Sequence, residues 1–172
     1  MLAAAVFAST TAQAQSESRP QTRNGFWIGF GLGYGSLGCE DCDDRAGAGS
    51  AYFKLGGTVS QRLLIGGEFN GWTKKESGVT LSYSHASGVV YFYPSARGGL
   101  YLKGGAGIAT IRLDAGPFGD GSTTGAGIIL GIGYDARVGR NFSLTPYFNM
   151  MGGSFDGGSA NMAQFGLGFS WH

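Results

Sequence analysis

Apolar side chains alternate with small or polar ones along eight segments of the chain, each about ten residues long. The last segment shows the pattern most clearly. Glycine or polar residues occupy one parity, and the other parity comprises Ala163, Phe165, Leu167, Phe169 and Trp171. Successive side chains of a β-strand point to opposite faces, so a period of two predicts strands. The sequence therefore predicts an all-β protein.

The connections between these segments fall into two length classes. Strands are expected at residues 25–35, 50–59, 63–73, 80–93, 99–112, 123–138, 142–151 and from about 161 to the C-terminus. Short turns are expected at 60–62, 94–98 and 139–141, and long polar loops at 36–49, 74–79, 113–122 and 152–160. Outer-membrane barrels have short periplasmic turns and longer extracellular loops, and a sheet in lipid must close to satisfy its edges. We therefore predict an eight-stranded antiparallel up-and-down transmembrane β-barrel with both termini in the periplasm.

One parity of each strand is predicted to face lipid because it carries nearly all the aliphatic side chains. In the first strand these residues are Phe26, Ile28, Phe30, Leu32 and Tyr34. In the fourth strand they are Leu81, Tyr83, Val89, Tyr91 and Tyr93. Aromatic residues gather near the strand ends, where rings prefer the lipid headgroup boundary. A soluble, exported lipocalin-like barrel is the alternative, and it would require an apolar interior and a polar exterior.

The N-terminus indicates export. An apolar run of residues 1–8 precedes Ala12-Gln13-Ala14, a small-x-small triplet typical of signal-peptide cleavage. We expect a signal peptide at 1–14, a disordered periplasmic lead-in at 15–24, and the barrel at 25–172, located in the bacterial outer membrane.

Composition excludes several other classes of protein. The chain contains 34 glycines, which disfavour helices, and no stretch has the 18 or more consecutive apolar residues of a membrane helix. The 12 basic and 11 acidic side chains form no basic stripe, so no nucleic-acid partner is expected.

Strand count, connection rhythm and the final Phe165-x-Leu167-x-Phe169-x-Trp171 pattern resemble the OmpA transmembrane domain and OmpX group of small outer-membrane barrels. The resemblance implies contact with outer-membrane lipids and lipopolysaccharide. It also implies recognition of the last strand by the barrel-assembly machinery during insertion. It says little about activity, because a fold does not fix a function.

The predicted inward parity collects charged side chains: Lys54, Glu68, Lys103, Asp135 and Arg137. An eight-stranded barrel is just wide enough to be filled by side chains, and an unpaired buried charge costs several kcal/mol. We therefore expect a packed polar network that plugs the interior, with a gated polar path as the alternative. A turn at 60–62 would pair Val59 with Leu63 and place Lys54 opposite Glu68, within salt-bridge distance.

Cys39 and Cys42 lie close together in the first predicted loop. In an oxidising compartment a disulfide between them is the simplest expectation. A zinc site would require four ligands, and Cys-x-x-Cys supplies two. The acidic run from Glu40 to Asp44 offers oxygen ligands for a divalent cation, although such runs are more often simply hydrated.

His85 and Ser87 share the predicted lipid-facing parity of the fourth strand. The pair resembles that of outer-membrane lipid A deacylases, but a serine nucleophile requires a base that an acid orients. No carboxylate has a fitting position on the predicted outer face. We therefore predict a non-enzymatic barrel with a structural or loop-mediated role, an unknown surface partner and no cofactor, and keep a lipid A-modifying hydrolase as the alternative.

Overall fold

The computed structural model describes residues 22–39 and 44–172, apart from the side chain of Phe118. Strands make up 80 % of the described residues. The strands are β1 (Phe26–Cys39), β2 (Ala46–Ser60), β3 (Leu63–Glu76), β4 (Val79–Phe92), β5 (Leu100–Asp114), β6 (Asp120–Tyr134), β7 (Ala136–Arg137), β8 (Phe142–Phe155) and β9 (Gly158–Trp171). The 3-10 turn η1 (Gly116–Phe118) lies between β5 and β6.

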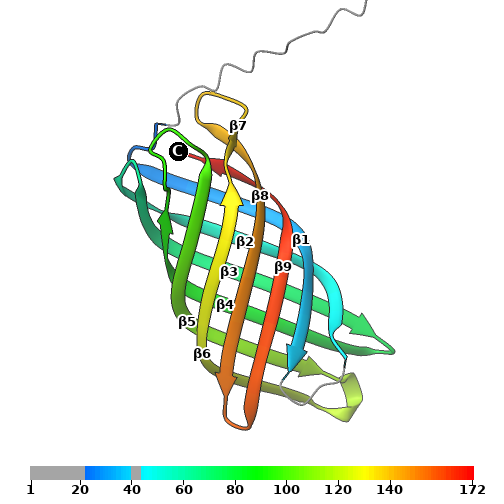
Figure 1. Ribbon diagram of the computed structural model, residues 1–172. Coiled ribbons are helices and arrows are strands. Elements are labelled where there is room, and N and C mark those ends of the chain that lie inside the picture. The colour runs from blue at the N-terminus through cyan, green and yellow to red at the C-terminus, as the bar shows by residue number, and fades with distance from the viewer. Residues whose placement is uncertain (1–21, 40–43) are drawn as a thin grey trace, which may run out of the picture.

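The strands form one closed antiparallel sheet (Figure 1). Apart from β6 and β7, strands that are neighbours in sequence pair with each other, and the β1–β9 and β6–β8 pairings leave the sheet without a free edge. Strand β8 pairs with both β6 and β7. Because only Asp135 separates β6 from β7, these two segments share one position in the wall. The predicted eight-stranded up-and-down transmembrane barrel is therefore confirmed.

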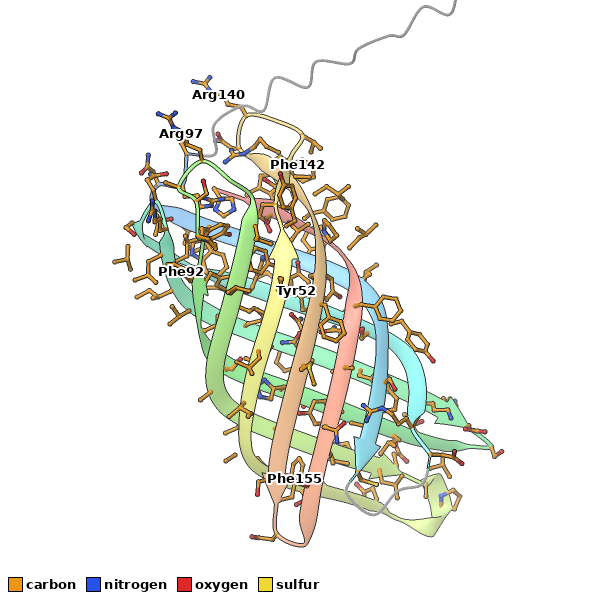
Figure 2. All side chains as sticks on the ribbon, in the orientation of Figure 1. Tyr52, Phe92, Arg97, Arg140, Phe142 and Phe155 are labelled. Atoms are coloured by element: carbon orange, nitrogen blue, oxygen red, sulfur yellow. The ribbon has the colours of Figure 1, made fainter. Side chains whose placement is uncertain are left out.

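The two ends of the barrel differ. The terminal end carries residues 22–24, His172 and the connections at 61–62, 93–99 and 138–141. The hairpin end carries the turns at 77–78, 115–119 and 156–157. Figure 2 shows Arg97 and Arg140 at one end of the barrel and Phe155 at the opposite end. Both described termini therefore lie at the same end of the barrel.

The predicted long loops are wrong for most of their length, because the strands continue through them. Strands β3 and β4 are joined by Ser77 and Gly78 alone, and β8 and β9 by Asp156 and Gly157. Ser77 and Gly78 have φ values of 51° and 84°. Positive φ at both central residues is the mark of a type I′ turn, whose twist matches that of the strands. The long strands have 14 or 15 residues, more than the 9–11 that cross a bilayer.

The outer surface of the wall is apolar. Leu32 is 71 % exposed and Leu130 is 62 % exposed. Exposed aromatic rings accompany these aliphatic side chains, among them Phe26, Phe69, Tyr134 and Phe165. An apolar surface of this extent is not tolerated by soluble monomers, and it is the opposite of what a lipocalin-like barrel requires. Separately, no helix in the described residues is long and apolar enough to span a membrane.

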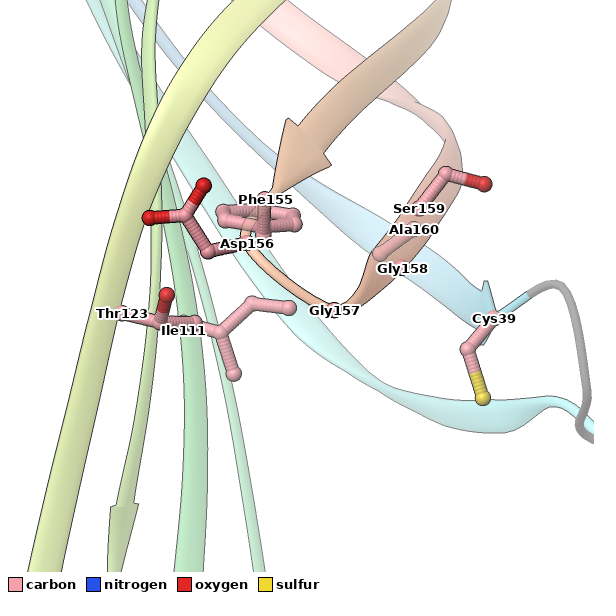
Figure 3. Close-up of a pocket in the computed structure, with 9 residues that line it drawn as sticks. All are labelled: Cys39, Ile111, Thr123, Phe155, Asp156, Gly157, Gly158, Ser159 and Ala160. Atoms are coloured by element: carbon pink, nitrogen blue, oxygen red, sulfur yellow. The ribbon is translucent and has the colours of Figure 1, made fainter.

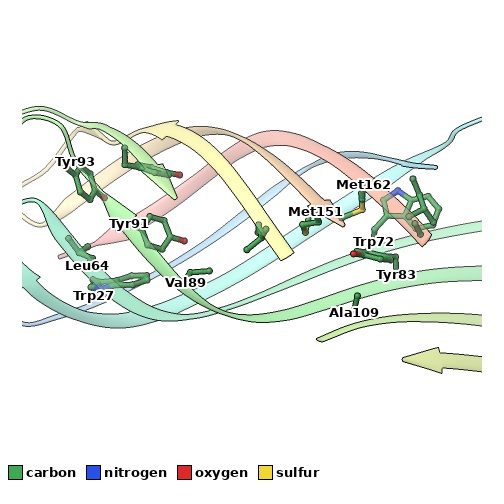
Figure 4. Packing of buried hydrophobic residues seen from close by; sticks show 14 residues of the cluster. Trp27, Leu64, Trp72, Tyr83, Val89, Tyr91, Tyr93, Ala109, Met151 and Met162 are labelled. Carbon is green, nitrogen blue, oxygen red and sulfur yellow. The ribbon is translucent and has the colours of Figure 1, made fainter. Parts of the chain in front are cut away.

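The interior is filled by large side chains, many of them aromatic (Figure 4). Glycines at directly paired positions of the neighbouring strands make room for them. A Cβ at Gly29 would lie 2.7 Å from Lys54 Cε, and a Cβ at Gly131 would lie 2.7 Å from Lys103 Cε. Where glycine alternates with apolar residues along a strand, the glycines therefore face the crowded lumen and the apolar residues face outward.

The predicted orientation of β4 is wrong. Tyr83, Val89, Tyr91 and Tyr93 are buried in the lumen, whereas Val90 and Phe92 are exposed on the outer surface. The physical reason is the β3–β4 register: the two-residue turn sets Ser87 opposite the inward-facing Glu68. Directly opposed residues share a face of the sheet, so every second residue of β4 from Leu81 to Tyr91 faces inward.

The register between β2 and β3 places Lys54 opposite Glu68, as predicted. The turn itself differs from the prediction. Ser60, rather than Val59, lies opposite Leu63, and the ladder shifts between Thr58 and Ser60. This bulge leaves Gln61 and Arg62 as the turn, so the register beyond it is preserved.

Candidate functional site

The candidate site is the polar part of the lumen, and its central contact is an ion pair between β3 and β5. Lys103 Nζ lies 2.5 Å from Glu68 Oε1, and the two side chains are 3 % and 0 % exposed. Glu68 also accepts hydrogen bonds from Asn70, at 2.9 Å, and from the hydroxyl of Tyr91. A buried carboxylate is tolerated when its oxygens are paired in this way.

Lys54 is buried near this pair but does not form the predicted salt bridge, since Glu68 takes Lys103 as its ionic partner among the described residues. The Lys54 ammonium instead lies over four aromatic rings. Its Nζ is 5.0 Å from the ring centre of Tyr91, 5.3 Å from Tyr101, 5.5 Å from Tyr52 and 5.9 Å from Trp27. Cations are attracted to ring faces within about 6 Å. The inward orientation of β4 supplies Tyr91 and so explains why aromatic rings surround this lysine.

A second acidic centre lies at the terminal end, where Asp135 interrupts the strand. Tyr93 and Thr145 each donate a hydrogen bond of 2.7 Å to its carboxylate, and His172 Nε2 lies 3.5 Å away. Burial raises the pKa of Asp135, but the neighbouring His172, the positive charge of Lys54 and the Thr145 hydrogen bond together hold it below its usual range. Asp135 therefore stays ionised, and its contacts tie the C-terminal residue to the wall.

Arg23 closes the terminal end, although it falls in the segment predicted as a disordered lead-in. Its side chain is fully buried, its guanidinium carbon lies 3.4 Å from the centre of the Tyr93 ring, and Nη2 donates a 2.6 Å hydrogen bond to the Gly98 carbonyl. Gln61 Oε1 accepts a 3.0 Å hydrogen bond from the backbone N–H of Arg23, and Gln61 Nε2 donates a 2.7 Å hydrogen bond to the Arg23 carbonyl. Order therefore extends upstream of residue 25, and Arg23 joins two separate turns.

The predicted interior residues thus lie in two places. Lys54, Glu68 and Lys103 lie together in the lumen, and Asp135 lies at the terminal end. Arg137 is only partly buried there, where it donates 2.6 Å and 3.4 Å hydrogen bonds to the carbonyls of Arg140 and Thr22. The predicted network did not include the residues that surround these charges: Arg23, Asn70, Tyr91, Tyr93, Tyr101, Thr145 and His172.

The Ser77-Gly78 turn could have predicted the inward orientation of several of these residues. Reading it as a two-residue hairpin sets Glu68 opposite Ser87 and places Tyr91 inside the barrel. The contacts of Arg23 and His172 form only in the closed barrel, so no local sequence pattern predicts them.

His85 and Ser87 face the lumen instead of lipid, with 0 % and 8 % exposure. In the described part of the chain, neither ring nitrogen of His85 has a hydrogen-bond partner, so no acid orients it. A nucleophilic serine requires such a relay. The premise of the lipid A hydrolase, an outward-facing His and Ser, is therefore wrong.

Cys39 is the last residue of β1. Its predicted disulfide partner Cys42, and most of the acidic run from Glu40 to Asp44, lie outside the described residues. Within the described residues, no group of three or more His, Cys, Asp or Glu side chains is arranged to hold a metal ion.

Comparison with known proteins gives relatives in structure only. No protein-family model matches the sequence, and no curated protein does. Neisserial surface protein A superposes with a TM-score of 0.65 at 16 % identity, covering 88 % of this chain and 99 % of that one. The Ail protein of Yersinia pestis, solved with the heparin analogue sucrose octasulfate, gives 0.59 at 16 % identity, over 86 % and 99 % of the two chains. The N-terminal barrel domain of Pseudomonas aeruginosa OprF gives 0.55 at 16 % identity, over 87 % and 100 %.

This chain has the fold of the small outer-membrane β-barrels. Identities this low show the fold alone, and what each of these proteins binds is a property of that protein. The predicted similarity to OmpA- and OmpX-like barrels is confirmed at that level.

Proposed function

We propose that this protein is a bacterial outer-membrane barrel with a plugged, non-conducting interior. Its role would be structural or carried by the hairpins that it exposes, without enzymatic activity of its own. The observation that carries this proposal is the Lys103–Glu68 ion pair, which joins β3 and β5 inside a barrel whose outer wall is apolar. Tyr91, Tyr101 and Tyr93 extend the filled region toward Asp135 through ring contacts of 5.3 and 5.7 Å.

The expected orientation has the terminal end in the periplasm and the hairpin end outside the cell. The predicted signal peptide and the position of both described termini at one end of the barrel support this orientation. Outward-facing Lys75 and Arg112 lie near the hairpin end, where lipopolysaccharide phosphates would be found. The aromatic final strand fits recognition by the barrel-assembly machinery, and no nucleic-acid partner is expected.

Conductance tests the plug directly. Purified protein in planar bilayers should show no steady current, while a large porin measured under the same conditions provides the positive control. A stable open channel would contradict the plug but leave the membrane location intact.

Accessible cysteines test the orientation. In a Cys39→Ser/Cys42→Ser background, Ser77→Cys should react with a membrane-impermeant maleimide on intact cells, whereas Arg97→Cys should react only after lysis. The reverse labelling pattern would overturn the orientation. Heat-dependent migration on gels confirms that each variant is folded.

A further inference from the structure

The lumen becomes more apolar toward the hairpin end, where Leu37, Leu81 and Ile111 line its wall. Two adjoining cavities of about 240 and 280 Å³ lie there and share Cys39, Ile111 and Ala160 in their walls. Figure 3 shows the larger one between the ends of the strands and the β8–β9 turn. We call this region the mouth pocket and define it by Leu37, Ala46, Leu81, Ile111, Phe155 and Ala160.

The pocket has an apolar base. Ala46, Leu81, Ile111 and Phe155 are partly buried and pack on the buried cluster that includes Trp72 and Met162. The only polar group of Trp72 is already used, since its Nε1 donates a 2.9 Å hydrogen bond to the Gly35 carbonyl. The walls of the smaller cavity are mostly apolar, so they offer water few partners, and sites of this kind accept apolar ligands.

We propose that the mouth pocket binds a compact, uncharged, apolar molecule the size of one or two fused rings. An engineered apolar cavity of about 150 Å³ binds benzene, and the 240 Å³ cavity here is large enough for a somewhat bigger ring system. Asp44 and Asp156 also line the two cavities. Their negative charges disfavour an anionic ligand such as a fatty acid, so the preferred ligand carries no charge.

The pocket stops short of the charged residues. Asn149 and Gln164, bonded to each other at 3.0 Å, are fully buried polar side chains of β8 and β9. In sequence they lie on the terminal side of Met151 and Met162. A ligand entering at the hairpin end therefore meets polar side chains beyond the cluster and is held at the mouth. Entry from outside the cell rests on the proposed orientation, but binding itself does not.

Methyl NMR of the full barrel in lipid nanodiscs, with naphthalene as the probe, tests the proposal. Naphthalene should shift the methyl signals of Leu37, Leu81 and Ile111 saturably. Lipid-facing Ile65 and Leu130, which are 47 % and 62 % exposed, should show no saturable shift, because they report only partitioning into the bilayer. No saturable change at the pocket, or equal saturation at the lipid-facing methyls, overturns the proposal.

Pocket-filling variants provide the matched comparison. Ala46→Leu and Ala160→Phe should weaken naphthalene binding at least tenfold, whereas Ala106→Leu, on the lipid-facing surface of β5, should leave it unchanged. Folding of each variant is checked by heat-dependent gel migration. Unchanged affinity in a folded filling variant overturns the proposal.

The charge argument gives a test on the unmodified protein. Anionic 2-naphthoate should bind at least tenfold more weakly than naphthalene, and equal affinity overturns the assignment of an uncharged ligand. Because this measurement needs no variant, it decides the case even where a filling substitution prevents folding. A conducting barrel that still binds naphthalene would contradict the plug alone.

Discussion

The terminal and hairpin ends of the lumen use opposite chemistry within the same wall. Toward the terminal end, Glu68, Lys103 and Asp135 are buried and held by hydrogen bonds. Toward the hairpin end, the side chains that line the mouth pocket are mostly apolar, and cavities remain between them. Buried charges require fixed partners, whereas an apolar mouth that partly meets solvent does not. The comparison suggests that stability is concentrated at one end and that the other end is free to vary.

The largest expected effect comes from removing the central carboxylate. Glu68→Leu should lower the free energy of unfolding by about 3–5 kcal/mol, because it leaves Lys103 buried without its ionic partner. Urea unfolding in lipid vesicles, followed by tryptophan fluorescence, measures the change. Glu76→Gln is the control at the hairpin end, since Glu76 also pairs with a lysine, Lys74, but its side chain is 70 % exposed. The control should unfold like the wild type, and a comparable loss in both variants would contradict the contrast between the ends.

The fold was accessible from the sequence because period-two alternation survives along every long strand. Phe26, Phe53 and Phe165 face outward as that pattern requires. The predicted orientation of β4 was wrong because its inward-facing positions carry Tyr83, Val89 and Tyr91. Side chains of these types are expected to face lipid when only their apolar character is considered. In this barrel, tyrosines fill the space that glycines leave, and their hydroxyls reach buried carboxylates.

The candidate site could be predicted only in part from the sequence. Parity identified Lys54, Glu68 and Lys103 as inward, and turn geometry set Lys54 opposite Glu68. The choice of Lys103 as the partner of Glu68 depends on contacts across the lumen between β3 and β5, which are not adjacent in the sheet. Pairing across a closed barrel follows from its tilt and from side-chain packing, and neither can be read from one strand pair.

The same substitution at two isoleucines compares the packing of the deep lumen with that of the mouth pocket. Ile129 is fully buried, so Ile129→Ala should cost about 2–5 kcal/mol through lost burial and a new cavity. Ile111 lines the existing mouth pocket, so Ile111→Ala should cost less than half as much as Ile129→Ala. The same urea unfolding assay measures both variants. Equal losses would show that the mouth is packed as tightly as the deep lumen.

Arg23 tests whether the terminal end is held by the segment that precedes β1. Arg23→Ala removes the stacking on Tyr93 and the hydrogen bond to Gly98, and should cost about 1–3 kcal/mol. Hydrogen exchange of the turns at 61–62 and 93–99 should increase, while the turn at 77–78 stays unchanged. Arg97→Ala, at an exposed position of the same end, is the matched control. Unchanged exchange at the terminal end in Arg23→Ala would indicate that Arg23 adds no rigidity there.

The smallest expected effect is a dependence on acid at the terminal end. The pKa of Asp135 in the folded protein is lower than its usual value. Ionised Asp135 therefore contributes its full stabilisation above about pH 4, which is the pKa of an aspartate in the unfolded chain. That contribution is lost as the pH falls toward the lowered pKa. Asp135→Asn should therefore be less stable than the wild type at pH 7, and the difference should shrink by pH 3. Urea midpoints at the two pH values measure it, and Asp156→Asn, in the β8–β9 turn, is the control. A difference that stays constant or grows in acid would mean that the Asp135 contacts do not depend on its charge, so that the terminal end is held by packing alone.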